Sequence, residues 1–144
     1  MTIGAALRAH LLADVQIAAM VTARVYPLQL PQKTVLPAIV LTRISGPRPG
    51  HLRGANGIAR PRYQVDSWAV THYVATLLGV LCRQRLNGYT GTWSDGDSPE
   101  MIIRVTILME PEGDRDLFVE DISGGLYRYS ADYRIWHSTA DGTV

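Results

Sequence analysis

The sequence contains one cysteine and one lysine, and neither belongs to a motif that carries known chemistry. Cys82 has no second cysteine with which to form an intrachain disulfide, and the apolar helical pattern around it predicts a buried, reduced thiol. A reduced thiol is consistent with synthesis in a cytoplasm. The glycines between residues 46 and 57 are followed by no lysine, which excludes a phosphate-binding P-loop.

A long uninterrupted hydrophobic run is also missing. Arg8 and His10 interrupt the apolar N-terminal stretch, so it has the pattern of neither a signal peptide nor a membrane helix, and we expect no membrane partner. Hydrophobic residues make up 47% of the chain and charged residues 19%, as in ordinary globular domains. We therefore expect one domain over residues 1–144, with a flexible loop at about 46–60 and a frayed end at about 138–144.

Side chains that could support catalysis or metal binding are not grouped in the sequence. No two of the four histidines have metal-ligand spacing, and the acidic turn at 95–100 is too short and proline-broken for a calcium loop. His10 and Asp14 lie one helical turn apart and could form a catalytic dyad, but a surface pair near a helix end is the simpler interpretation. We predict no catalytic residues, no metal and no cofactor, and keep a small hydrolase or metal enzyme as an alternative.

Hydrophobic periodicity predicts an α+β fold. We expect a mostly antiparallel sheet of about four strands, with helices packed on one face and a long loop between the first two long strands. The helices are expected at about 2–13, 14–21 and 70–86, and the strands at about 38–45, 62–69, 101–110 and 126–137, with a short extended piece at 24–26. Thr2 and Asp14 have the chemistry of helix N-caps. The stretch 46–60 is predicted to be irregular, and 112–116 to be a charged turn.

Two of these elements have faces that can be assigned from their spacing. The helix at 70–86 has a wide apolar stripe, formed by Val70, Tyr73, Val74, Leu77, Leu78, Leu81 and Leu86. The last strand alternates between an apolar side, with Tyr127, Tyr129 and Tyr133, and a polar side. Those tyrosines could stack nucleic-acid bases, but a buried core face is the simpler interpretation. The three tryptophans could anchor an interface or lie half-buried in the domain.

Charge is separated along the chain although the net charge is only +1. Residues 43–65 contain no acid, whereas nine of the 13 acidic residues fall within 95–121. The acid-free stretch carries Arg43, Arg48, His51, Arg53, Arg60 and Arg62. It could act as a small nucleic-acid-binding module that contacts phosphates, or meet the acidic segment of a neighbouring copy in a head-to-tail contact that closes a ring. A solvated loop without a partner is the third interpretation.

Four stretches in this order carry a family resemblance. They are AALRAHLLADVQIAAMVTARVYP, LPAIVLTRISG, GIARPRYQVDSWAVTHYVATLLGVLCRQRLNGYTG and DISGGLYRYSADYRIWH, at residues 5–27, 36–46, 57–91 and 121–137. Together they cover nearly the whole chain. The set resembles the tail terminator, or tail completion, proteins of long-tailed bacteriophages and phage-like gene transfer agents.

The resemblance implies a structural virion protein and no enzyme. It implies a hexameric ring that caps the tail tube, ends its polymerisation and joins the tail to the head connector, or stopper, while DNA passes through the lumen. The subunit would be made in the host cytoplasm and reside at the head–tail interface. The subunit or partner interface is expected at Arg48, His51, Arg53, Asn56, Arg60, Glu112, Asp114, Asp116, Glu120 and Asp121. Arg48 and Arg53 are candidates to face the lumen. The alternative function remains a nucleic-acid-binding module built on the basic loop Arg43–Arg62.

Overall fold

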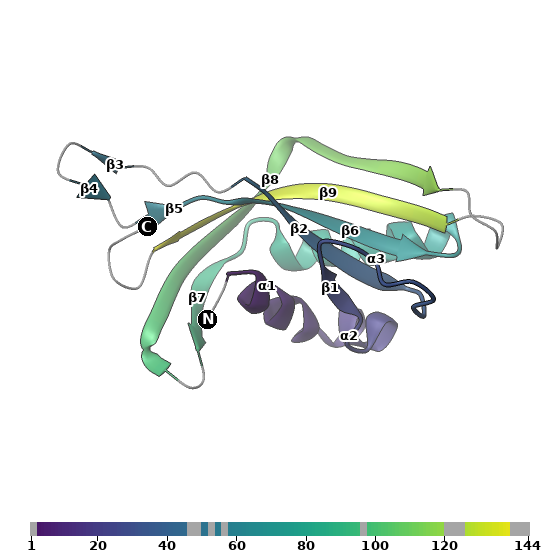
Figure 1. The fold of residues 1–144 in the computed structure, drawn as a ribbon, viewed down its shortest axis with the longest axis horizontal. Coiled ribbons are helices and arrows are strands. Elements are labelled where there is room, and N and C mark those ends of the chain that lie inside the picture. Colours follow the sequence, from purple (N-terminus) through teal and green to yellow (C-terminus); the bar gives the residue numbers. More distant parts are fainter. Residues whose placement is uncertain are drawn as a thin grey trace.

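The computed structural model describes residues 3–45, 50–51, 54–55, 58–95, 98–119 and 126–138. Figure 1 shows three helices beneath a curved sheet. The helices are α1 (Ile3–Leu12), α2 (Val15–Val21) and α3 (His72–Leu86). The strands are β1 (Val25–Pro27), β2 (Ala38–Ser45), β3 (Gly50–His51), β4 (Gly54–Ala55), β5 (Ile58–Ala59), β6 (Arg62–Ala69), β7 (Thr90–Asp95), β8 (Ser98–Val119) and β9 (Leu126–Ser138).

The sheet is larger than the sequence analysis predicted, although the α+β class is as expected. It has seven strands in the order β1-β2-β6-β9-β8-β7, with β5 pairing with β9, instead of about four. It is mixed, because β1 runs parallel to β2 while the other pairs are antiparallel. Of the extra strands, β1 forms where a short extended piece was expected and β7 lies at the opposite edge, whereas β5 pairs with β9. A two-residue strand such as β5 leaves almost no periodic signal in a sequence.

Two segments that were predicted to be irregular contribute strands. The expected turn at 112–116 is wrong, because β8 continues through it and pairs with β9 as far as Val119. Pro111 and Gly113, which has φ of 74°, lie where the register shifts between Met109 and Asp114. They form a bulge instead of a turn. Within the expected loop 46–60, β3 pairs with β4, and β5 joins the main sheet through Ile58↔Ser138 and Ala59↔His137.

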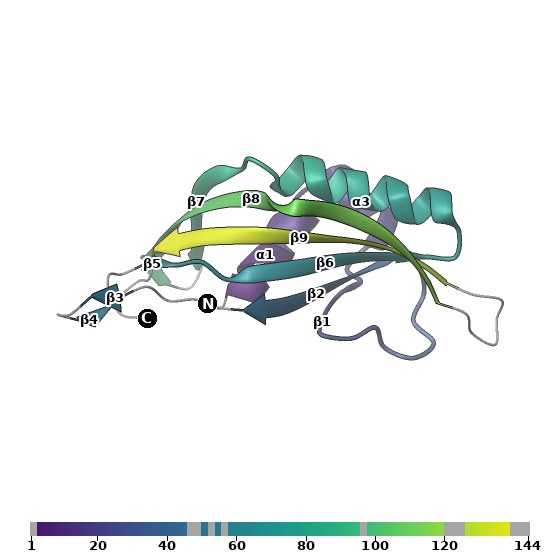
Figure 2. The same cartoon turned by 90° about the horizontal axis from the view of Figure 1, so that it is seen from above.

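All three helices lie on one side of the sheet, as predicted (Figures 1 and 2). We call this side the inner face and the opposite side the outer face. Asp14 caps α2 as expected: its Oδ1 accepts hydrogen bonds from the backbone N–H groups of Gln16 (2.9 Å) and Ile17 (3.2 Å). Thr71 caps α3 by accepting from Val74 N–H at 3.2 Å. The predicted cap Thr2 lies outside the described residues. No single described helix has the length and apolar composition to cross a membrane; α1 and α2 pass that test only when taken together across a 97° bend.

The inner face forms one continuous hydrophobic core. Tyr129 and Tyr133 are buried in it, which confirms the core interpretation of the last strand's apolar side. Cys82 is buried as predicted, and this burial raises the pKa of its thiol to about 12, so the group stays protonated and unreactive at neutral pH.

The orientation of α3 differs from the prediction. The residues that it buries are Ala75, Leu78, Gly79, Cys82 and Leu86, whereas Tyr73 is 74% and Leu77 38% exposed. Val70 precedes the helix and is also exposed. The physical reason is the close approach at Gly79: a Cβ there would lie 2.0 Å from Cδ1 of Tyr129. The helix therefore turns its small residues toward the sheet, and part of the predicted apolar stripe faces away.

Candidate assembly surfaces

The outer face of the sheet carries a network of ion pairs that joins β6, β8 and β9. Asp132 accepts hydrogen bonds from both Nε and Nη2 of Arg62, and Arg115 lies 3.6 Å from its other oxygen. The Asp132 side chain is only 6% exposed, so its negative charge depends on these guanidinium groups. Arg62 is thus committed to a partner within the chain. In the nucleic-acid-binding alternative, Arg62 is therefore one arginine fewer that can contact phosphates.

Two further ion pairs extend this network along the same face. Arg128 lies 3.8 Å from the buried carboxylate of Asp66, which also accepts from Gln64. Arg134 donates to Glu110 at 2.7 Å. Spacing along one strand could not have revealed these pairs, because Arg62 and Asp132 lie 70 residues apart and meet only through the β6–β9 register.

Arg60 lies beside this network in a different environment. Its guanidinium carbon is 5.3 Å from the ring centroid of Trp136, a cation–π distance, and its backbone carbonyl accepts from Arg134 at 3.1 Å. Among the described residues, no carboxylate forms an ion pair with Arg60. Around it, Trp136 is 39% and Leu108 49% exposed, and Ile58 is exposed as well. Trp136 is therefore the tryptophan whose exposure fits the interface-anchor interpretation.

Two of the predicted acidic interface residues lie along β8 beside α3. Asp114 is 3.4 Å from Nη1 of Arg83, and Asp116 is 3.4 Å from Nε2 of His72. The Asp116 side chain is 60% exposed, so water screens this pair and leaves the carboxylate accessible. Glu112 lies at the bulge of β8, but its side chain is outside what the structure describes.

The other predicted interface residues are not placed by the structure. Arg48, Arg53, Asn56, Glu120 and Asp121 lie outside the described residues. The backbone of His51 is described in β3, where it pairs with Gly54. The interface roles of these residues, and the lumen-facing orientation of Arg48 and Arg53, stay predictions.

The His10–Asp14 interpretations are both wrong, since His10 lies neither in a dyad nor on the surface. Its ring centroid lies 4.3 Å from that of Tyr89 and 5.4 Å from that of Trp93, and it is buried. Its backbone carbonyl accepts from Nε of Arg85 at 3.0 Å. Burial, followed by the positive charge of Arg85, lowers the pKa of His10. No group of three or more His, Cys, Asp or Glu side chains that could hold a metal occurs in the described part of the chain.

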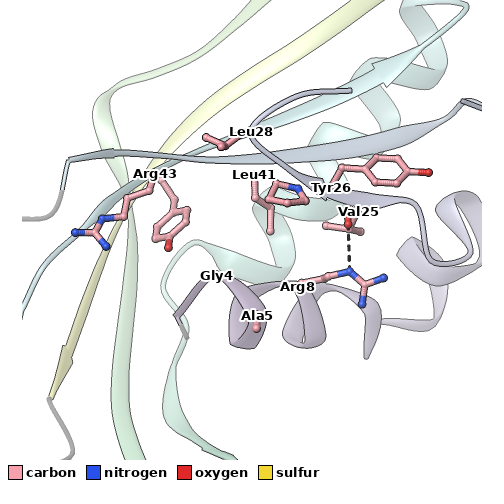
Figure 3. Close-up of a pocket in the computed structure, with 10 residues that line it drawn as sticks. Gly4, Ala5, Arg8, Val25, Tyr26, Leu28, Leu41 and Arg43 are labelled. Atoms are coloured by element: carbon pink, nitrogen blue, oxygen red, sulfur yellow. Dashed lines mark hydrogen bonds between the residues drawn. The ribbon is translucent and has the colours of Figure 1, made fainter. Parts of the chain in front are cut away.

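A cavity of about 380 Å³ lies between the start of α1 and strands β1 and β2 (Figure 3). Its lining includes Leu28, Leu41 and Tyr63, with Arg43 at one end. Arg8 also lines it, but this side chain is occupied by the carbonyl groups of Val25 and Ala23. The lining contains no carboxylate, histidine or thiol. Such a wall offers shape and apolar surface but no general acid–base pair for hydrolysis.

Comparison with known proteins decides the family. Residues 5–138 match the sequence family described as tail completion protein gp17. This chain belongs to that family. No curated protein sequence is significantly similar to it. Its fold is similar to that of a chain in the solved virion of a native gene transfer agent particle, with a TM-score of 0.68, 94% of each chain covered and 18% sequence identity. At that identity the likeness shows a shared fold.

Membership in the tail completion family confirms the resemblance seen in the sequence, and it identifies the chain as a structural protein of a virion tail. For such a protein the candidate site is a surface. The described residues offer two candidates: the outer-face patch around Arg60 and Trp136, and the helix face of α3 beside Asp114 and Asp116.

Proposed function

We propose that this tail completion protein forms a ring, of six copies, at the end of the tail tube. The ring ends polymerisation of the tube protein and joins the tail to the head connector at the head–tail interface. The observation that carries the proposal is the family match over residues 5–138. The number of copies rests on the family resemblance, and neighbour contacts rest on the charge separation between the basic and acidic segments.

The subunits would be synthesised in the host cytoplasm and assemble on the finished tube. The interface would include Arg60, Asp114 and Asp116, which the structure leaves at or near the surface. Arg48 and Arg53 would face the lumen and meet passing DNA transiently through its phosphates. No chemical step is required of any side chain in this role.

The experiment compares particles produced with and without the protein. Without it, electron microscopy should show tails of variable length that are not joined to heads, and supplying the protein should restore tails of uniform length. Tails that are uniform and attached to heads in its absence would overturn the proposal. Native mass spectrometry of the protein, alone and released from tail tubes, measures the number of copies in the ring.

A further inference from the structure

Up to the polar Gln84, the outward face of α3 is apolar, although none of the described helices or strands covers it. Tyr73, Leu77 and Val80 recur at helical spacing on the side opposite the buried residues. The 15-residue helix has charged side chains only in its last turn, at Arg83 and Arg85. A helix exposed on the surface of a globular protein normally carries charged residues on its outward face. We call this stripe, with Asp114 and Asp116 along its flank, the helix surface.

The second candidate lies on the other side of the sheet. Ile58, Leu108 and Trp136 are exposed there, with Arg60 stacked on Trp136. The register places them together, because Trp136 pairs with Thr106, two residues from Leu108, and Ile58 pairs with Ser138, two residues from Trp136. Tryptophan and arginine are the residue types that most often dominate binding energy at protein interfaces. We call this patch the sheet surface.

The two surfaces point in opposite directions. α3 lies under the inner face and begins near one end of the long axis, whereas β5 and the end of β9 lie at the other end (Figures 1 and 2). A contact between two different surfaces of identical subunits is heterologous, and its repetition generates a ring when the rotation closes. Two different surfaces on opposite sides of one subunit allow each copy to contact one neighbour through each surface.

The charges favour contact between unlike surfaces over contact between like ones. Sheet surface against sheet surface would place Arg60 near its own copy. Helix surface against helix surface would bring together the exposed Asp116 carboxylates of two copies, whereas Asp114 is already paired with Arg83. Sheet surface against helix surface instead brings the Arg60 guanidinium to Asp116 while apolar side chains meet each other. Opposite charges around an apolar centre specify the partner and its orientation.

We propose that the sheet surface of one copy binds the helix surface of the next copy, and that this contact is the repeating interface of the ring. The inference rests on the proposed function, because it assigns the surfaces through which that ring is built. Cysteine cross-linking can test it, since the one native thiol, Cys82, is buried and protonated at neutral pH.

The double variant Leu77→Cys/Leu108→Cys carries one new thiol on each surface, at positions that are partly exposed. Treated with a short bis-maleimide, alone and on tail tubes, it should give a ladder of covalent multimers that ends at the closed ring. The single variants Leu77→Cys and Leu108→Cys should stay monomeric in denaturing gels, because a heterologous contact never brings identical positions together. Circular dichroism melting confirms that all three variants fold.

The possible outcomes separate the inference from the function on which it rests. Rings seen by electron microscopy without a ladder would overturn the assigned surfaces and leave the ring intact. Cross-linked dimers in a single variant would show a symmetric contact and would also overturn them. A protein that remains monomeric both alone and with tail tubes would contradict the proposed function, and the surfaces with it.

Charge reversal provides an independent measurement. Arg60→Glu and Asp116→Arg should each weaken assembly on tubes by about tenfold or more, because each places like charges together. The combined variant should recover most of that loss, since it restores an opposite-charge pair with reversed polarity. Lys33→Glu is the matched control, as Lys33 is exposed and belongs to neither surface. Failure of the combined variant to recover, with both single variants impaired, would contradict the pairing of Arg60 with Asp116.

Discussion

On the inner face of β6 and β9, Val65 and Ala131 belong to the helix-covered core, whereas the next residues along, Asp66 and Asp132, are equally inaccessible on the outer face. The two faces are buried by different means. The inner face is closed by close-packed side chains, so its stability depends on volume. The outer face is closed by guanidinium groups lying over carboxylates, so its stability depends on the integrity of each charge pair.

Removing volume from the inner face should have the largest effect. Leu78 in α3 is fully buried, and Leu78→Ala should lower the free energy of unfolding by about 2–5 kcal/mol through lost apolar contact and the cavity left behind. Urea denaturation followed by circular dichroism measures the change. Leu77→Ala, one residue along the same helix and partly exposed, is the matched control and should cost much less. Equal losses would show that α3 does not bury the face described above.

Adding volume to the inner face tests the approach of α3 to the sheet. Gly79→Ala places a Cβ against the Tyr129 ring and should destabilise the protein by about 1–3 kcal/mol. Gly4→Ala makes the same change in α1, where the added Cβ would lie an ordinary 3.5 Å from the Tyr63 hydroxyl. Because alanine is the better helix former, that control should be neutral or slightly stabilising. Thermal melting of both variants provides the comparison, and a neutral Gly79→Ala would argue against the close contact.

Removing a charge from the outer face tests its ion pairs without changing side-chain volume. Asp132→Asn should cost about 1–3 kcal/mol, because Arg62 and Arg115 lose the carboxylate that compensates them. Asp116→Asn breaks an exposed pair and should change stability by no measurable amount. Chemical denaturation of both variants should separate a buried ion pair from a surface one. Equal losses of unfolding free energy in the two variants would show that the burial of Asp132 does not strengthen its ion pairs.

The smallest expected effect concerns pH and His10. Burial lowers the pKa of this histidine in the folded protein, so the unfolded chain binds the proton first as the pH falls. The contribution of neutral His10 is therefore present above the unfolded-state pKa of about 6.5 and is lost as the pH falls through the lower, folded-state pKa. The melting temperature measured from neutral to mildly acidic pH should decline less steeply for His10→Gln than for the native sequence. Parallel declines would exclude His10 as a source of the pH dependence.

The sequence predicted the parts of the fold whose signals are local. The limits of β2 and β6 and the Asp14 cap follow from alternation and capping chemistry within a few residues. The orientation of α3 did not follow, because its apolar residues cover more than one side and only contact between Gly79 and Tyr129 decides which side turns inward. For the candidate site, Arg60 and the acids were predicted from charge, but the exposed Trp136 patch needed the sheet register.

The bulge in β8 has a geometric consequence for the proposed surfaces. Leu108, Asp114 and Asp116 are an even number of residues apart, so in a regular strand their side chains would all point to one side. Here four residues of β8 lie between the pairs Met109↔Tyr133 and Asp114↔Ala131, opposite one residue of β9, so the bulge adds three residues, an odd number. It therefore reverses the alternation, and one strand presents Leu108 outward and the two acids toward α3. A slip of the distal part of β8 by one residue against β9 would return the acids to the side of Leu108. It would leave the composition of the strand unchanged and exchange the side chains that its two faces present to a neighbour.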